Sequence, residues 1–85
     1  MKEISYTITD PEGLHARPAG MLVKEAGKYQ SDIKIEKNGK SADAKRIFAI
    51  MGLGVKNAET IKITAEGEDE DTAIMKLEVF FKENL

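Results

Sequence analysis

The sequence predicts an α+β fold in which helices cover one face of an antiparallel sheet. Apolar and polar residues alternate in several short segments, two other segments repeat apolar residues at helical spacing, and an Asn-Gly pair separates two strand-like runs. Alternation of this kind is typical of half-buried strands in a sheet with one open face. A chain of 85 residues accommodates one core, so we expect a single domain over residues 1–85.

The first third of the chain predicts a strand followed by a helix. Side chains alternate between apolar and polar from Lys2 to Thr9, which indicates a half-buried strand. The run Asp10-Pro11-Glu12-Gly13 then predicts a turn. From Ala16 to Tyr29 apolar residues recur every four positions, which predicts an amphipathic helix, and Pro18 is tolerated in its first turn.

The middle of the chain predicts a hairpin and a short helix. Ile33 to Glu36 alternates in polarity, and Asn38-Gly39 is a strong signal for a two-residue hairpin turn. A short return strand is therefore expected over Lys40 to Asp43. The apolar cluster from Ile47 to Leu53 is too short for a long helix, and we interpret it as a short one.

The last third predicts one more strand and the longest helix. Thr60 to Glu66 alternates in polarity again. Asp69, Glu70 and Asp71 would supply a cap and first-turn negative charge to the final helix. Its predicted apolar stripe is formed by Ala73, Ile74, Leu77, Phe80 and Phe81. The predicted element order is strand, helix, strand, strand, helix, strand, helix.

The composition excludes several classes of function. Thirteen basic and fifteen acidic residues give a formal charge of −2, which provides no general attraction for nucleic acid or anionic lipid. The chain has no cysteine, so disulfides, thiolate catalysis and zinc-thiolate sites are excluded. It shows no signal-peptide pattern and no apolar run long enough to insert into a membrane. We therefore expect a cytoplasmic protein whose partners are other proteins.

The only histidine, His15, lies in the run Gly13-Leu14-His15-Ala16-Arg17-Pro18-Ala19, where the strand pattern ends and the helix pattern begins. A helix start presents unpaired main-chain N–H groups and the positive end of the helix dipole, which together receive anions. Arg17 adds a fixed positive charge nearby, although a cation at a helix start is unfavourable to the dipole. His15 is therefore a candidate nucleophile.

Four roles for His15 are possible from the sequence. A metal site needs several ligands, and the chain has no second histidine, no cysteine and no EF-hand spacing. Acid–base catalysis on a small molecule needs a concave pocket, for which an 85-residue open sheet has little volume. A structural cap remains a plain alternative. Nucleophilic use is favoured by the helix start and Arg17, which disfavour the imidazolium form and would stabilise an attached phosphoryl group.

The cluster from Ile47 to Leu53 is expected to be only partly buried, because one short helix cannot bury all its sides against one sheet. Ile50 and Leu53 are expected in the core, whereas Phe48 and Met51 suit a protein-binding surface. A domain that binds partners through this surface alone, without His15 chemistry, is the alternative function.

The run from Gly13 to Ala19 resembles the active-site signature of the HPr family, the histidine-containing phosphocarriers of the bacterial phosphotransferase system. The element order, the Lys-Ser pair after the hairpin turn, the pattern from Ile47 to Val55 and the final helix are similar to that family as well. The resemblance implies an open-faced β-sandwich of four antiparallel strands and three helices.

The resemblance also implies a function. Enzyme I would transfer a phosphoenolpyruvate-derived phosphoryl group to Nδ1 of His15, and IIA components of sugar uptake would receive it. Arg17 and the main-chain N–H groups of Ala16 and Arg17 would contact the phosphate, with no cofactor or metal. The protein would be a stoichiometric carrier, and we expect a monomer.

Two surface positions complete the resemblance. Ile47, Phe48 and Met51 lie where the family presents its docking surface. Position 46, where the family usually has a serine that a kinase phosphorylates, is Arg46 in this chain. Arginine cannot be phosphorylated by that kinase, and its charge is opposite to that of phosphoserine. The resemblance therefore supports the carrier role and not the serine-based regulation.

Overall fold

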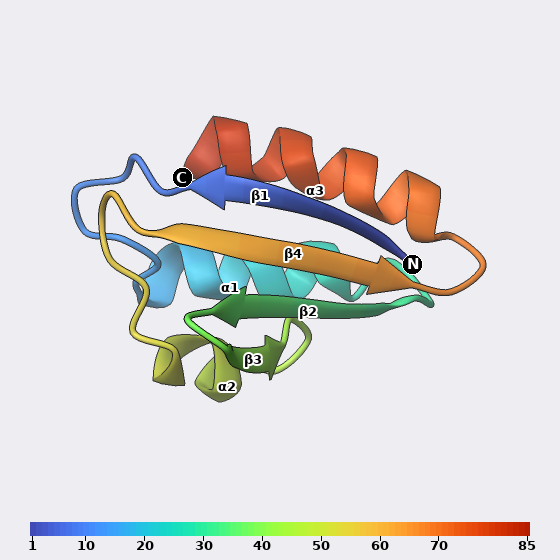
Figure 1. Cartoon of the computed structure of the whole chain (residues 1–85), viewed down its shortest axis with the longest axis horizontal. Helices are drawn as coiled ribbons and strands as arrows, with labels where there is room; N and C mark the ends of the chain where they lie inside the picture. The colour runs from blue at the N-terminus through green and yellow to red at the C-terminus, as the bar shows by residue number, and fades with distance from the viewer.

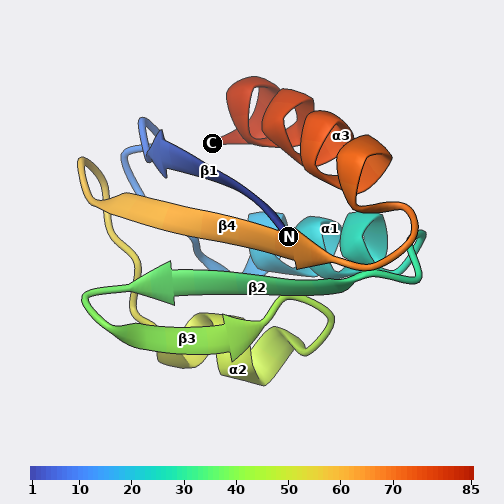
Figure 2. The same ribbon diagram turned by 45° about the vertical axis from the view of Figure 1, so that its right-hand side comes forward.

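The computed structural model describes all 85 residues and contains a four-stranded sheet and three helices (Figure 1). The strands have the order β1-β4-β2-β3, and every neighbouring pair is antiparallel (Figure 2). The predicted α+β class and element order are confirmed. The elements are β1 (Lys2–Thr7), α1 (Ala16–Ala26), β2 (Asp32–Lys37), β3 (Lys40–Asp43), α2 (Ile47–Gly52), β4 (Thr60–Glu66) and α3 (Glu70–Asn84).

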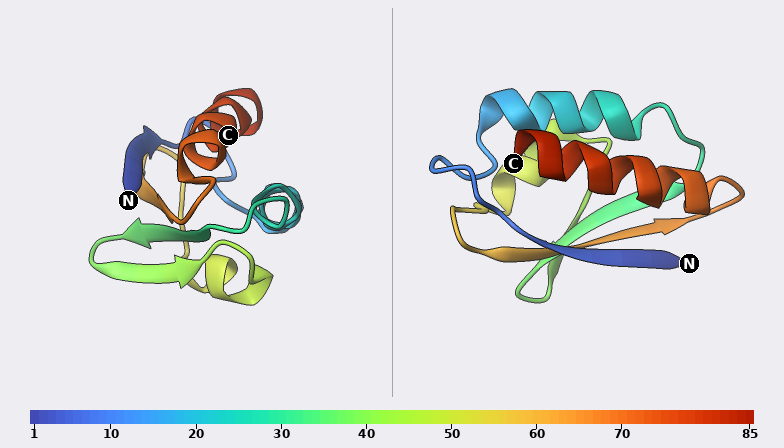
Figure 3. Two further views of the ribbon diagram at one scale, coloured as in Figure 1. Left: turned by 90° about the vertical axis from the view of Figure 1, so that its right-hand side faces the viewer. Right: turned by 90° about the horizontal axis from the view of Figure 1, so that it is seen from above.

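The three helices lie on one side of the sheet (Figure 3). The core between the layers is built on the two central strands, where Ile35 of β2 is opposite Ile63 of β4 and both are fully buried. The predicted stripe of α3 contributes buried Leu77 and Phe81 to the same core. Because the intervening residues of the strands are polar, the other face of the sheet is left open.

Two glycines are required by the backbone. Asn38 and Gly39 form the β2–β3 turn with φ of 52° and 83°, the left-handed conformation that this hairpin turn demands. Gly13 has a φ of 70°, and a Cβ atom there would collide with the carbonyl oxygen of Val55. The segment before His15 therefore runs closely past the segment around Val55, and only glycine fits at position 13.

Two predicted boundaries were too long. The first strand ends at Thr7 rather than Thr9, because the N–H of Ile8 donates to Glu59 and that of Thr9 donates to Leu85 outside the sheet ladder. The helix α1 ends at Ala26 rather than Tyr29. The N–H of Tyr29 bonds to the carbonyl oxygen of Ala26 at 3.2 Å, a three-residue spacing that tightens the chain into a turn.

The predicted capping role of Asp69 was wrong. Asp69 does occupy the N-cap position of α3, but its side chain makes no capping hydrogen bond. Its carboxylate accepts hydrogen bonds from the N–H groups of Gln30 and Ser31, both at 2.9 Å, and from the Ser31 hydroxyl. The hydroxyl of Ser31, followed by the main-chain donors, lowers the pKa of Asp69. This carboxylate joins the β4–α3 turn to the α1–β2 connection.

None of the helices combines the length and apolar character needed to cross a membrane. The structure also contains no group of three or more acidic or histidine side chains arranged to hold a metal ion.

Candidate functional site

His15 occupies the N-cap position of α1, as the sequence predicts. Its backbone is extended, with φ of −85° and ψ of −175°, and its carbonyl oxygen accepts the first helical hydrogen bond, from Ala19 at 2.9 Å. The preceding Leu14 is buried, and its N–H bonds to Val55 at 3.0 Å. A fixed backbone thus holds the imidazole, whose side chain is 35 % exposed.

The first turn of α1 offers free hydrogen-bond donors. The N–H groups of Ala16 and Arg17 have no acceptor in the structure, and Pro18 has no N–H to offer. The guanidinium of Arg17 is exposed and forms no ion pair within the molecule. Free donors and a guanidinium thus lie together at the helix start, an arrangement that favours an anion.

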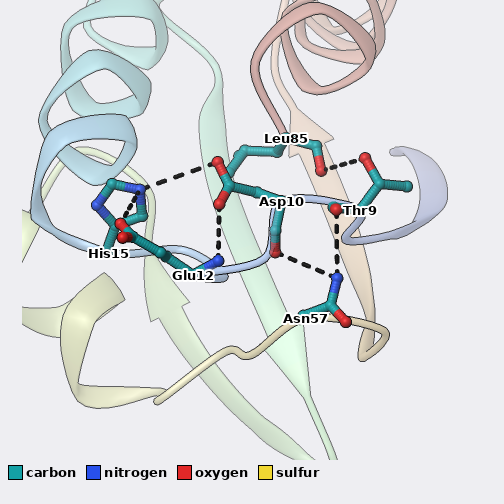
Figure 4. Close-up of polar contacts among 6 residues, drawn as sticks. All are labelled: Thr9, Asp10, Glu12, His15, Asn57 and Leu85. Atoms are coloured by element: carbon teal, nitrogen blue, oxygen red, sulfur yellow. Dashed lines mark hydrogen bonds and ion pairs between the residues drawn. The ribbon is translucent and has the colours of Figure 1, made fainter.

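Two carboxylates next to His15 were not recognised from the sequence, where they were interpreted only as turn residues. Glu12 Oε2 lies 3.4 Å from His15 Nε2, and Asp10 Oδ2 lies 3.9 Å from the same atom. The other ring nitrogen, Nδ1, points away from both carboxylates (Figure 4). The signal available in the sequence was the position of both acidic residues within five residues of the only histidine.

Several hydrogen bonds fix the backbone of the loop that carries these carboxylates (Figure 4). Asp10 Oδ1 accepts the N–H of Glu12 at 2.8 Å, which closes a local turn. Asn57 donates to the carbonyl oxygens of Thr9 and Asp10, each at 3.2 Å. Leu85 O accepts the N–H groups of Thr9 and Asp10, at 2.6 and 2.9 Å. The end of α3 and the segment before β4 therefore both fix the loop at His15.

A depression of about 290 Å³ lies beside His15 and is open to solvent. Only one of its seven lining residues is hydrophobic, whereas pockets that bind small molecules are enclosed and mostly apolar. It does not have the deep shape that a small-molecule enzyme would need. The lining residues are Asp10, His15, Arg17, Pro18, Met21, Glu83 and Asn84, and the last two, from the end of α3, were not expected from the sequence.

The prediction for the apolar residues around the short helix α2 is confirmed for Ile50, Phe48 and Met51, whereas Leu53, predicted in the core, is only half-buried just after the helix. Ile50 is fully buried, while Phe48 is 85 % exposed and Met51 41 % exposed. Ile47 is half-buried and packs against the core. Arg46 occupies the N-cap position of α2, is exposed and forms no ion pair. An apolar surface formed by Ile47, Phe48 and Met51, hereafter the α2 surface, is therefore accessible next to a free cation.

A lysine fixes the far end of α2. Lys37 Nζ donates to Gly54 O at 2.8 Å and lies 2.9 Å from Glu59 Oε1. The hydrogen bond from Lys37 is the largest cause of the lowered pKa of Glu59. A cation at the carbonyl end of a helix is favourable, so the α2 surface is held on a fixed backbone rather than on a loose loop.

Comparison with known proteins assigns the family. The family model described as the PTS HPr component phosphorylation site matches residues 2–83. The histidine-containing phosphocarrier protein of a mycoplasma is similar, with 40 % identity, 96 % of this chain and 93 % of that chain covered, and a TM-score of 0.93. An HPr from Thermoanaerobacter tengcongensis has 44 % identity over the whole of both chains, with a TM-score of 0.85.

A third similar structure is the Bacillus subtilis catabolite repression protein Crh, described as a domain-swapped dimer. It has 36 % identity, covers all of this chain and 98 % of its own, and has a TM-score of 0.79. The chain belongs to the HPr family of the phosphotransferase system. Its family and fold support a phosphocarrier role in that system.

Proposed function

We propose that this protein accepts a phosphoryl group on Nδ1 of His15 from phosphorylated enzyme I and passes it to IIA components in sugar uptake. The observation that carries the proposal is the half-exposed His15 ring at a helix start with two unpaired N–H groups, those of Ala16 and Arg17, and a free guanidinium beside it. These groups are the ones that a phosphoryl group attached to the ring would need as partners.

The proposed transfer needs few catalytic groups, which suits a protein of 85 residues. In the proposed step the lone pair on Nδ1 forms the new bond to phosphorus, and the bond between phosphorus and the donor breaks with its electron pair remaining on the donor. Catalysis of such a transfer is mainly positioning and charge stabilisation. An open depression suits this step better than a closed pocket, because the donor is the side chain of another protein and has to reach the ring.

The α2 surface is the proposed docking site for these partners. Phe48 and Met51 are exposed, although side chains of this size are usually buried. Arg17 and Arg46 both present free positive charge close to α1 and α2, the two helices that pack against each other. We infer a partner surface that combines an apolar centre with acidic residues around it.

The direct test is phosphorylation by enzyme I with phosphoenolpyruvate. We expect one acid-labile, base-stable phosphate on the wild-type protein and none on His15→Ala, since phosphohistidine is the proposed product. A variant such as Glu68→Gln, which changes an exposed side chain without hydrogen bonds or ion pairs, should take up phosphate as the wild type does. Phosphate uptake by His15→Ala would refute the proposed acceptor.

The second candidate is a regulatory domain that binds partners through the α2 surface without carrying phosphate. Two observations favour it: the 85 % exposure of Phe48 and the similarity to Crh, a catabolite repression protein. On this hypothesis a partner would bind His15→Ala as well as the wild type and would lose affinity for Phe48→Ala. The phosphorylation assay distinguishes the two functions, because the regulatory domain would leave His15 unmodified.

A further inference from the structure

We propose that Glu12, assisted by Asp10, is a positioning residue for phosphoryl transfer to His15. The two carboxylates hold the ring proton on Nε2, leave the lone pair on Nδ1, and balance the positive charge that the ring gains when Nδ1 is phosphorylated. This inference rests on the proposed function and adds the groups that control the nucleophile.

The geometry separates the two sides of the ring. The polar contacts of Nε2 are the carboxylates of Glu12 at 3.4 Å and Asp10 at 3.9 Å, and the ring forms no other ion pair or hydrogen bond. Nδ1 points the other way (Figure 4). Neither contact is a hydrogen bond, so the carboxylates act on the ring through their negative charge, which favours hydrogen on the nearer ring nitrogen, Nε2. In a neutral ring with hydrogen on Nε2, the nitrogen with the free lone pair is Nδ1.

The proton and charge balance explains why carboxylates are useful at Nε2. A neutral ring with hydrogen on Nε2 can attack through Nδ1 without losing a proton, and the electron pair of the broken bond stays on the donor. The phosphorylated ring then carries a positive charge, which the free neutral ring does not. A negative charge beside Nε2 therefore stabilises the phosphorylated ring more than the free ring. An interaction that strengthens as the step proceeds lowers its barrier.

The two carboxylates are held to different degrees. The side chain of Asp10 is 25 % exposed, and its Oδ1 is engaged by the N–H of Glu12, so Oδ2 is left to face the ring. The side chain of Glu12 is 75 % exposed and is closer to Nε2. Asn57 and Leu85 fix the backbone of Asp10 from two directions. One carboxylate held by hydrogen bonds and one more exposed carboxylate thus face the same nitrogen.

The test uses Glu12→Gln, Asp10→Asn and the double variant, with Glu68→Gln as the matched control at the opposite end of the molecule. Phosphoramidate is the phosphoryl donor, because it needs no docking surface; ammonia leaves as Nδ1 bonds to phosphorus. We expect the phosphorylation rate to fall about two- to fivefold in each single variant and up to about tenfold in the double variant, the range for partly exposed charge pairs. Formation of phosphohistidine is followed by phosphorus NMR.

A second measurement is independent of activity. Nitrogen NMR of the unphosphorylated ring should show the neutral wild-type form with hydrogen on Nε2. The inference alone is overturned if hydrogen is found mainly on Nδ1, or if the double variant reacts at the rate of Glu68→Gln. If enzyme I and phosphoenolpyruvate do not phosphorylate the wild type at His15, the proposed function fails and this inference fails with it.

Discussion

Two aspartates at opposite ends of the molecule precede helices, and neither caps its helix with its side chain. Asp69 lies in the β4–α3 turn and Asp10 in the β1–α1 loop (Figure 1). Asp69 accepts two main-chain N–H groups and the hydroxyl of the buried Ser31. Asp10 accepts a single N–H, from Glu12, and its second oxygen faces His15 at 3.9 Å.

The comparison shows how the number of donors determines what a carboxylate does. Three donors stabilise the charged form of Asp69 and lower its pKa, and they engage both of its oxygens in contacts that hold the fold together. Asp10 keeps one oxygen free of hydrogen bonds beside a ring that can change its charge. We therefore interpret the Asp69 end as structural and the Asp10 end as functional, and four predictions test that division.

The largest expected effect is on stability, at the structural end. Asp69→Ala removes the acceptor of Ser31, whose buried hydroxyl and N–H would be left unpaired. We expect the melting temperature to fall by roughly 10 °C, while His15 remains fully phosphorylatable below that temperature. Calorimetry and the enzyme I assay measure the two quantities.

Asp71→Ala and Asp10→Asn are the controls for this prediction. Asp71 is exposed, and its contact is an ion pair with Lys2 at 3.4 Å, so its removal should change the melting temperature by only a few degrees. Asp10→Asn should slow phosphoryl transfer and leave stability nearly unchanged. Equal losses of stability in Asp69→Ala and Asp10→Asn would contradict the division of the two ends.

The second prediction concerns the arginine at the functional end. Arg17→Ala should reduce the rate of phosphoryl transfer about tenfold or more, because it removes a charge-assisted donor from the reacting phosphoryl group. The melting temperature should not fall, since Arg17 is exposed, has no partner and opposes the helix dipole. Single-turnover transfer from phosphoramidate, which needs no docking surface, measures the rate. The matched variant Arg46→Ala, assayed with phosphoramidate, should react normally because Arg46 lies outside the depression.

Most of the fold could be predicted from the sequence because its signals are local. Alternating polarity identified the strands, and Asn38-Gly39 identified the hairpin. Two of the errors occurred where tertiary contacts override local preference. The sequence predicts that Thr9 continues the strand, but its N–H and hydroxyl bond to Leu85, 76 residues away. It also predicts Asp69 as a helix cap, but the Asp69 carboxylate accepts hydrogen bonds from Ser31, 38 residues away.

The candidate site was predicted in part for the same reason. His15, Arg17 and the helix start are adjacent in the sequence, so their common position followed from the chain itself. Glu12 and Asp10 are equally near, but a turn motif explained them without chemistry. Glu83 and Asn84 reach the depression only because α3 packs beside α1, and no local pattern indicates that contact.

The third prediction uses acid to weaken the structural end. A carboxylate whose pKa is lowered in the folded state contributes stability above its unfolded pKa and loses it as the pH falls through the folded one. The free energy of unfolding should therefore decrease below about pH 4, and the difference between wild type and Asp69→Asn should shrink in that range. Urea titrations at several pH values measure it. The measurement requires that the wild type stays folded at about pH 2.5. If the difference in unfolding free energy between wild type and Asp69→Asn then stays constant down to about pH 2.5, Asp69 is not a stabilising charge.

The smallest effect is expected in alkali, and it also belongs to the structural end. Burial, followed by the hydrogen bond to Glu25 at 2.8 Å, raises the pKa of Tyr29 to about 12. A group whose pKa is raised on folding contributes stability below its unfolded pKa of about 10 and loses it as the pH rises toward the folded value. Tyr29→Phe should cost about 1 kcal/mol at pH 8, through the lost hydrogen bond. That cost should diminish as the pH rises above 10. Only the wild-type phenol ionises more readily once unfolded, and this ionisation favours the unfolded state of the wild type. Urea titrations of both proteins between pH 8 and 11 measure the change, and parallel stability curves would place the ionisation of Tyr29 outside the folding equilibrium.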